Sequence, residues 1–176
     1  MLAKVKDLVF RDRQIRICKG VIMVFNNQAK ENFSEINISY IKANDNYPIW
    51  EKYDDFGRSY YGVSHFWHVD PNVSSDTDLS WAEWDGNEVN ISFENIDLLE
   101  QKYIEAIGII KSWKIQLTKF TGSKFRICLS YDNGDLMDEE DRVYSFTLRF
   151  WKKRDNSELI TEIDNFDQPV IIDYCE

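Results

Sequence analysis

The chain has 176 residues, a formal net charge of −10 and 15% aromatic residues. This length and apolar content predict a single domain over residues 1–176 with its own hydrophobic core, and they exclude a disordered chain. Neither a bilayer-spanning apolar run nor the apolar core of a signal peptide is found, so we expect a cytoplasmic protein without a membrane partner. Three widely spaced cysteines, Cys18, Cys128 and Cys175, are typical of reduced thiols.

In the first part of the chain, alternation of apolar and polar residues, together with a continuous apolar run at residues 21–25, predicts mostly antiparallel strands. The predicted strands span residues 14–18, 21–25, 36–40 and 59–69. Residues 43–58 are rich in Asn, Asp, Tyr and Pro, and this composition predicts a long loop. Long loops often carry functional residues.

Residues 79–94 are predicted to form a β-hairpin, because residues 85–87 (Asp-Gly-Asn) supply turn chemistry between two alternating segments. Val89, Ile91 and Phe93 define the buried face of its second strand. Pairing parity then directs Trp81 and Glu83 to the opposite face. The expected outer face of this hairpin is therefore acidic and aromatic.

A long helix is predicted after Asn95, a good N-cap residue, because apolar residues recur at spacings of three and four from Ile96. The pattern allows the helix to end near Lys114 or to continue to Phe120. Further strands are predicted over residues 124–131, 143–151, 159–163 and 170–174. Together these elements predict an α+β fold, with mostly antiparallel twisted sheet and one long central helix packed on one face.

Charge is unevenly distributed along the chain. Residues 43–100 contain two basic and 13 acidic residues, together with four of the six tryptophans and four of the nine tyrosines. An acidic surface attracts cationic partners, and exposed Trp and Tyr are frequent anchors of protein interfaces. The alternative interpretation is that the acidity only confers solubility and the aromatic residues form the core.

If the first interpretation holds, seven residues are the candidates for binding a basic protein partner. Four lie on the expected outer hairpin face, two on the outer face of the preceding strand, and one in the long loop. They are Trp81, Glu83, Glu88 and Glu94, then Tyr60 and His68, then Trp50.

Motifs for catalysis, metal binding or a cofactor are not recognisable, so we expect no enzyme activity, metal or cofactor. His65 and His68 would lie on opposite faces of a strand, which disfavours joint metal ligation. A small hydrolase with an unrecognised site stays open as an alternative. Nucleic acid is not expected as a partner, although Lys124, Arg126, Arg149 and Trp151 share the outward side of two predicted strands and could bind single strands.

In its small size, acidity, α+β pattern and lack of catalytic motifs, the chain resembles bacterial immunity proteins that neutralise contact-dependent growth-inhibition and other polymorphic toxins. The resemblance covers the general character of the whole chain and carries over no motif residue. It implies a stoichiometric inhibitor in the cytosol that covers an essential surface of a cognate toxin domain. Many such toxins are basic nucleases.

Overall fold

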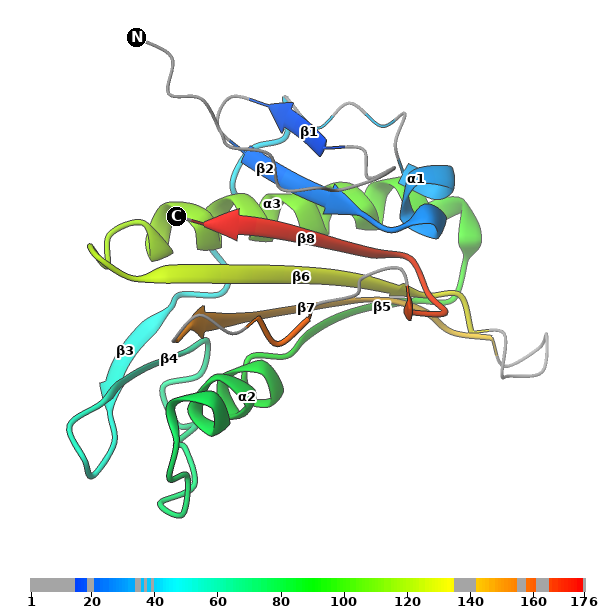
Figure 1. Cartoon of the computed structure of the whole chain (residues 1–176). Helices are drawn as coiled ribbons and strands as arrows, with labels where there is room; N and C mark the ends of the chain where they lie inside the picture. The colour runs from blue at the N-terminus through cyan, green and yellow to red at the C-terminus, as the bar shows by residue number, and fades with distance from the viewer. Residues whose placement is uncertain are drawn as a thin grey trace, which may run out of the picture.

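The computed structural model describes residues 15–18, 21–33, 36, 38, 40–134, 142–154, 158–160 and 165–175. Six strands form an antiparallel sheet in the order β1-β2-β8-β6-β7-β5, and β3 pairs with β4 in a separate hairpin (Figure 1). The strands are β1 (Ile15–Cys18), β2 (Val21–Phe25), β3 (Trp50–Tyr53), β4 (Ser59–Gly62), β5 (Val89–Phe93), β6 (Lys124–Asp132), β7 (Tyr144–Lys153) and β8 (Val170–Cys175). The helices are α1 (Asn27–Phe33), α2 (Asp76–Gly86), the 3-10 turn η1 (Ile96–Leu98) and α3 (Leu99–Leu117). The predicted α+β class is confirmed.

The main core lies between α3 and one face of the large sheet. Tyr103, Ile107 and Trp113 of α3 are fully buried against apolar residues of β6 and β7 such as Phe125 and Phe150. Ring contacts join the two layers, for example between Trp113 and Phe150 at 5.0 Å. This packing confirms the predicted central helix on one face of the sheet and the predicted strands over residues 124–131 and 143–151.

Asn95, predicted as the cap of the long helix, caps the 3-10 turn η1 that precedes α3, and α3 itself begins after Leu98 without a side-chain cap. The Asn95 side chain accepts a hydrogen bond from the Asp97 amide at 2.9 Å, and the resulting 3-10 turn leads into α3. The helix then ends at Leu117, between the two predicted end points. Within the described residues, no helix is both long and apolar enough to cross a membrane.

The opposite face of the sheet is covered as well. Trp151 and Cys128 are buried there beneath Trp84 of α2 and a segment that includes Leu159. Arg126 is only 2% exposed, and its guanidinium pairs with a carboxylate of that segment, Glu158, at 2.6 Å. The predicted parity of the basic positions is right, but two of the four side chains, Arg126 and Trp151, are not on the surface.

The predicted hairpin over residues 79–94 is wrong, because its first half is helix α2. Ser75 caps this helix: its hydroxyl accepts from the Asp78 amide at 3.0 Å, while the Asp78 carboxylate accepts from the Ser75 amide at 3.3 Å. This reciprocal pair is a capping box, and it favours helix over strand at residues 76–86. β5 pairs with β7 instead, from Val89 opposite Leu148 to Phe93 opposite Tyr144.

Smaller corrections concern the first half of the chain. The predicted loop over residues 43–58 contains β3, and the predicted strand over residues 59–69 ends at Gly62. No strand includes the described residues 36, 38, 40, 159 and 160, and residues 161–163 lie outside the described part of the chain. Cys128 and Cys175 are free and buried, whereas the Cys18 side chain lies outside the description.

Candidate protein-binding groove

One face of the β3–β4 hairpin is covered by the loop that follows it. Lys52 projects from β3 into this loop, where its ammonium donates to the carbonyl oxygens of Ser64 (2.7 Å), His65 (3.0 Å) and Trp67. Partial burial lowers the pKa of Lys52. These three hydrogen bonds from one ammonium hold the loop in a turn that directs the Trp67 ring toward α2.

The Trp67 ring occupies a slot between two glycines. A Cβ atom added to Gly86 would lie 2.1 Å from Cε2 of Trp67, and one added to Gly62 would lie 3.0 Å from Cε3. Tyr60 packs edge-on against the same ring at 5.6 Å, and its hydroxyl hydrogen-bonds to Nδ1 of His68 at 3.2 Å. Burial raises the pKa of Tyr60, so the hydroxyl is protonated at neutral pH.

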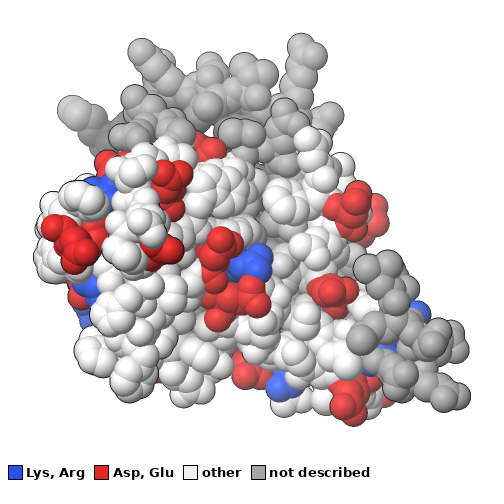
Figure 2. Space-filling model, turned by 90° about the horizontal axis from the view of Figure 1, so that it is seen from below, with Lys and Arg blue, Asp and Glu red and all other residues white. Residues whose placement is uncertain are grey.

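An open groove of about 560 Å³ lies between this loop and the C-terminal half of α2. It is lined by Trp67, His68, Val69, Asp70, Ala82, Asp85, Gly86 and Glu88. We call this the acidic groove. Three of its side chains are exposed carboxylates, on Asp70, Asp85 and Glu88. Figure 2 looks at the molecule from below Figure 1, the side on which α2 lies, and shows acidic side chains in separate groups among uncharged surface.

A strip of aromatic rings continues from the groove along α2. Trp81 is 44% exposed and contacts Trp84 edge-on at 6.5 Å. Trp84 in turn packs on the buried Trp151 at 4.9 Å, and the Arg149 guanidinium lies over its ring at 5.1 Å. Trp81 is therefore supported from below while its outer surface remains accessible.

Glu88 joins the strip to the groove. Its carboxylate accepts from the Asn90 side chain at 2.6 Å and forms an ion pair with Arg149. These two contacts lower the pKa of Glu88. Glu88 is therefore ionised at neutral pH at the mouth of the groove.

Comparison with known proteins gives no family for the chain. No family model, curated protein or solved structure matches it. Within the described ranges, no group of three or more His, Cys, Asp or Glu side chains could hold a metal ion.

Glu83 was predicted to be on the surface, but it is fully buried in the wall behind the groove. Its carboxylate accepts from both terminal nitrogens of Arg154 (2.7 and 2.8 Å) and from the amides of Tyr61 (2.9 Å) and Lys152 (2.7 Å). Burial raises the pKa of Glu83, and the hydrogen bonds and charge of Arg154 oppose that rise. Glu83 thus joins α2, β4 and β7 and cannot contact a partner.

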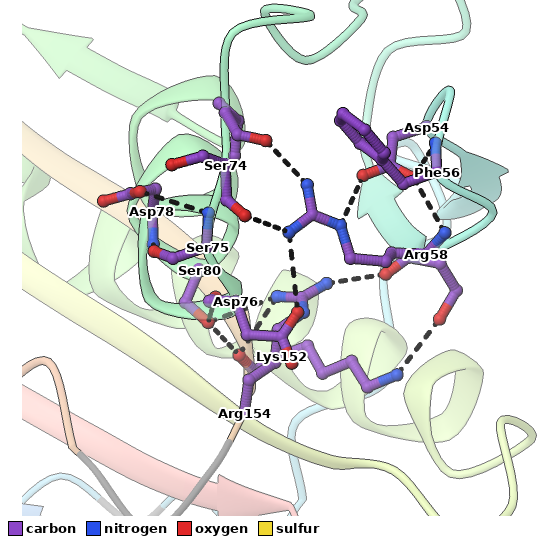
Figure 3. A network of polar contacts seen from close by, with 12 residues as sticks. Asp54, Phe56, Arg58, Ser74, Ser75, Asp76, Asp78, Ser80, Lys152 and Arg154 are labelled. Carbon is purple, nitrogen blue, oxygen red and sulfur yellow. Dashed lines mark hydrogen bonds and ion pairs between the residues drawn. The ribbon is translucent and has the colours of Figure 1, made fainter.

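A second polar network holds the start of α2 against the β3–β4 turn (Figure 3). The Arg58 guanidinium donates to the Asp54 carboxylate at 2.7 Å and to the carbonyl oxygens of Val73 (2.7 Å) and Ser74 (3.2 Å). Burial opposes ionisation of Asp54, but the hydrogen bonds and charge of Arg58 outweigh it and lower the pKa of Asp54. Both walls of the groove are therefore fixed by contacts between distant segments.

The seven predicted binding residues separate into three groups. His68, Trp81 and Glu88 gather at the groove. Trp50 and Glu94 are exposed but lie outside the groove. Trp50 of β3 is 43% exposed, and its ring packs against His65 of the loop that forms one wall, with 5.0 Å between the ring centroids. Glu94 lies about 20 Å from Glu88 along β5.

Two of the seven are buried. Tyr60 is only 2% exposed beneath His68, and Glu83 is internal. Conversely, Trp67, Asp70 and Asp85 line the groove but were not among the predictions. The acidity of their segment indicated the two aspartates, whereas Trp67 belonged to the predicted strand over residues 59–69, which ends at Gly62 in the structure.

Proposed function

We propose that this chain is a stoichiometric protein-binding inhibitor that neutralises a cationic toxin domain, in the manner of an immunity protein acting in the cytoplasm. The observation that supports it is the acidic groove next to Trp81. Carboxylates there can pair with Lys or Arg side chains of a partner, and exposed tryptophan faces can also hold cations. The proposal requires no catalysis by this chain.

A nuclease is the class of toxin that this surface suits best. Proteins that bind nucleic acid do so largely through Lys and Arg side chains that contact phosphates. An inhibitor that presents fixed carboxylates can occupy such a surface in place of the phosphates. Asp70, Asp85 and Glu88 would act in this way, and Trp81 would supply apolar contact area.

The alternatives receive less support from the geometry. The nucleic-acid alternative relied on basic strand positions, yet Arg126 is buried against Glu158 and Trp151 lies in the interior. The hydrolase alternative named no recognised site, and His68 of the groove hydrogen-bonds to a buried tyrosine hydroxyl rather than to a serine or cysteine nucleophile.

A growth-rescue assay tests the proposal. The candidate toxin is the C-terminal domain of the protein encoded immediately upstream of this chain. Expression of that domain is induced with and without this chain, and a mixture of the two proteins is analysed by native mass spectrometry. We expect growth arrest by the domain alone, rescue by the chain and a 1:1 complex. The charge reversal Asp85→Arg should abolish rescue, whereas Asp97→Arg, outside the groove, should preserve it. Absence of rescue, or equal rescue by both variants, would refute the proposal.

A further inference from the structure

β5 is the last strand of the large sheet, so among the residues that the structure describes one of its edges has no strand beside it. The hydrogen bonds made by the neighbouring strand β7 identify the backbone groups of β5 that lie along that edge. The Lys152 amide donates to Glu83, and the Phe150 carbonyl oxygen accepts from the Asn87 side chain at 3.2 Å, so both groups lie on the side of β7 away from β6. Backbone groups alternate in direction along a strand. The even-numbered residues of β7 therefore direct their N–H and C=O groups toward β5.

The register then identifies the free groups of β5. Leu148 lies opposite Val89 and Phe146 opposite Ile91, so Val89 and Ile91 use their backbone groups to pair with β7. Asn90 and Ser92 direct theirs to the other side. Within the described part of the chain, neither residue makes a backbone hydrogen bond across that edge. Two N–H and two C=O groups are thus available to an additional strand.

Side-chain charge indicates what kind of strand fits. Glu88 and Glu94 stand at the two ends of β5, share the parity of Asn90 and Ser92, and are exposed. If two copies paired antiparallel about Ile91, Glu88 of one copy would stand opposite Glu94 of the other. Like charges in directly opposed positions destabilise strand pairing, and charged edges protect against self-association. Residues of opposite charge at the same two positions would stabilise it.

We infer that the β5 edge receives an extended segment of the cationic partner as an added strand, with basic residues six positions apart facing Glu88 and Glu94. This inference rests on the proposed function and specifies how the partner binds. Glu88 both lines the acidic groove and begins the β5 edge, so groove and edge form one continuous surface. Backbone pairing supplies affinity, and the carboxylates select the charge of the segment.

The first test uses a capped synthetic peptide, Lys-Val-Thr-Val-Thr-Val-Lys, whose lysines match the spacing of the two glutamates. A twin with Glu at both ends is the control. Amide hydrogen exchange of the protein is followed by NMR as each peptide is added. We expect the lysine peptide to slow exchange at Asn90 and Ser92 at least fivefold and the glutamate peptide to have no effect. Unchanged exchange, or equal slowing by both peptides, would overturn the inference.

A matched pair of variants tests the same edge. Ser92→Pro removes an outward N–H without removing a hydrogen bond to β7, whereas Ser92→Ala keeps that N–H and removes only the hydroxyl. We expect the lysine peptide to bind at least tenfold more weakly to the proline variant and equally to the alanine variant. Equal binding to both would contradict the inference. If the proline variant does not fold, the exchange experiment on the unmodified protein decides.

The same spectra separate this inference from the proposed function. Peptide-induced changes confined to groove residues such as Trp67 and Asp85 would overturn strand addition while leaving a cation-binding groove. Protection of Asn90 and Ser92 together with failed growth rescue would support strand addition and refute the toxin-inhibitor proposal.

Discussion

Replacement of Glu83 should destabilise the fold, because Glu83 has a structural role although it lies in an acidic segment that suggests binding. Its carboxylate accepts four hydrogen bonds, and the Arg154 side chain that donates two of them is only 6% exposed. Glu83→Leu leaves the buried Arg154 guanidinium without a counter-charge, with only uncharged oxygens such as those of Ser59 and Ser80 as acceptors, and leaves two buried amides without an acceptor. Breaking one partner of a buried ion pair costs about 3–5 kcal/mol, and each orphaned amide adds to that cost. We expect a loss of about 4 kcal/mol, a large part of a typical stability of about 5–15 kcal/mol.

Urea denaturation followed by circular dichroism measures this loss as a change in unfolding free energy. The control is Glu88→Ala, which removes an exposed ion pair and should cost less than about 1 kcal/mol. A double variant, Glu83→Leu with Arg154→Leu, should be more stable than Glu83→Leu alone, because no buried charge is left unpaired. A loss below about 1 kcal/mol for Glu83→Leu would refute this view of the network.

Three further predictions concern the groove and the sheet face opposite α3. Trp81→Ala should weaken binding of the cognate toxin domain at least about tenfold without unfolding the chain, as calorimetric titration would show; unfolding would mean that Trp81 belongs to the core. Gly86→Ala places a methyl group against Trp67 and should cost about 1–3 kcal/mol, part of which Trp67→Leu should restore in thermal unfolding. Burial opposes ionisation of Glu158, but hydrogen bonds from Arg126 and Lys153 outweigh it and lower the pKa of Glu158. The contribution of Glu158 to stability is therefore fully present above its unfolded pKa of about 4.3 and is lost as the pH falls through its folded pKa. Glu158→Gln should therefore be less stable than the unmodified chain at pH 7, with the difference disappearing at acidic pH; a difference independent of pH would contradict this assignment.

The elements predicted correctly are those whose buried face is apolar. β6 alternates through Phe125, Ile127 and Leu129, and α3 carries an apolar stripe, because both pack against the same hydrophobic layer. Periodicity records such burial directly. The sequence alone therefore gives the class of the fold and most of the large sheet.

α2 was mistaken for a strand because its buried face is partly polar. Ser80 and Glu83 are buried there, and Glu83 is stabilised by Arg154, 71 residues away in the chain. No periodic pattern can indicate a buried glutamate whose partner is so distant. The capping box at Ser75 and Asp78 was the local signal for a helix, and it outweighs the apparent alternation that follows. The groove depends on α2, so its residues could be predicted only in part.

The salt dependence of toxin binding should show whether the partner is attracted by the acidic groove alone or by the acidity of the whole segment from residue 43 to residue 100. Several carboxylates between residues 43 and 100 are already paired, as with Glu83 and Arg154 or Glu88 and Arg149. Asp70 and Asp85 have no ion-pair partner among the residues that the structure describes.

With two exposed contacts of about 0.2–1 kcal/mol each, those of Asp70 and Asp85, raising the salt concentration from 50 to 500 mM should weaken binding of the toxin domain by about 30-fold at most. Isothermal titration at several salt concentrations measures this. A much steeper dependence would mean that carboxylates beyond Asp70 and Asp85 also contact the partner, and Glu94, which strand addition at β5 places opposite a basic residue, is the first to replace with Gln. If Glu94→Gln left the steep dependence unchanged, the partner would be bound by a broad negative surface, and the groove would lose its special role.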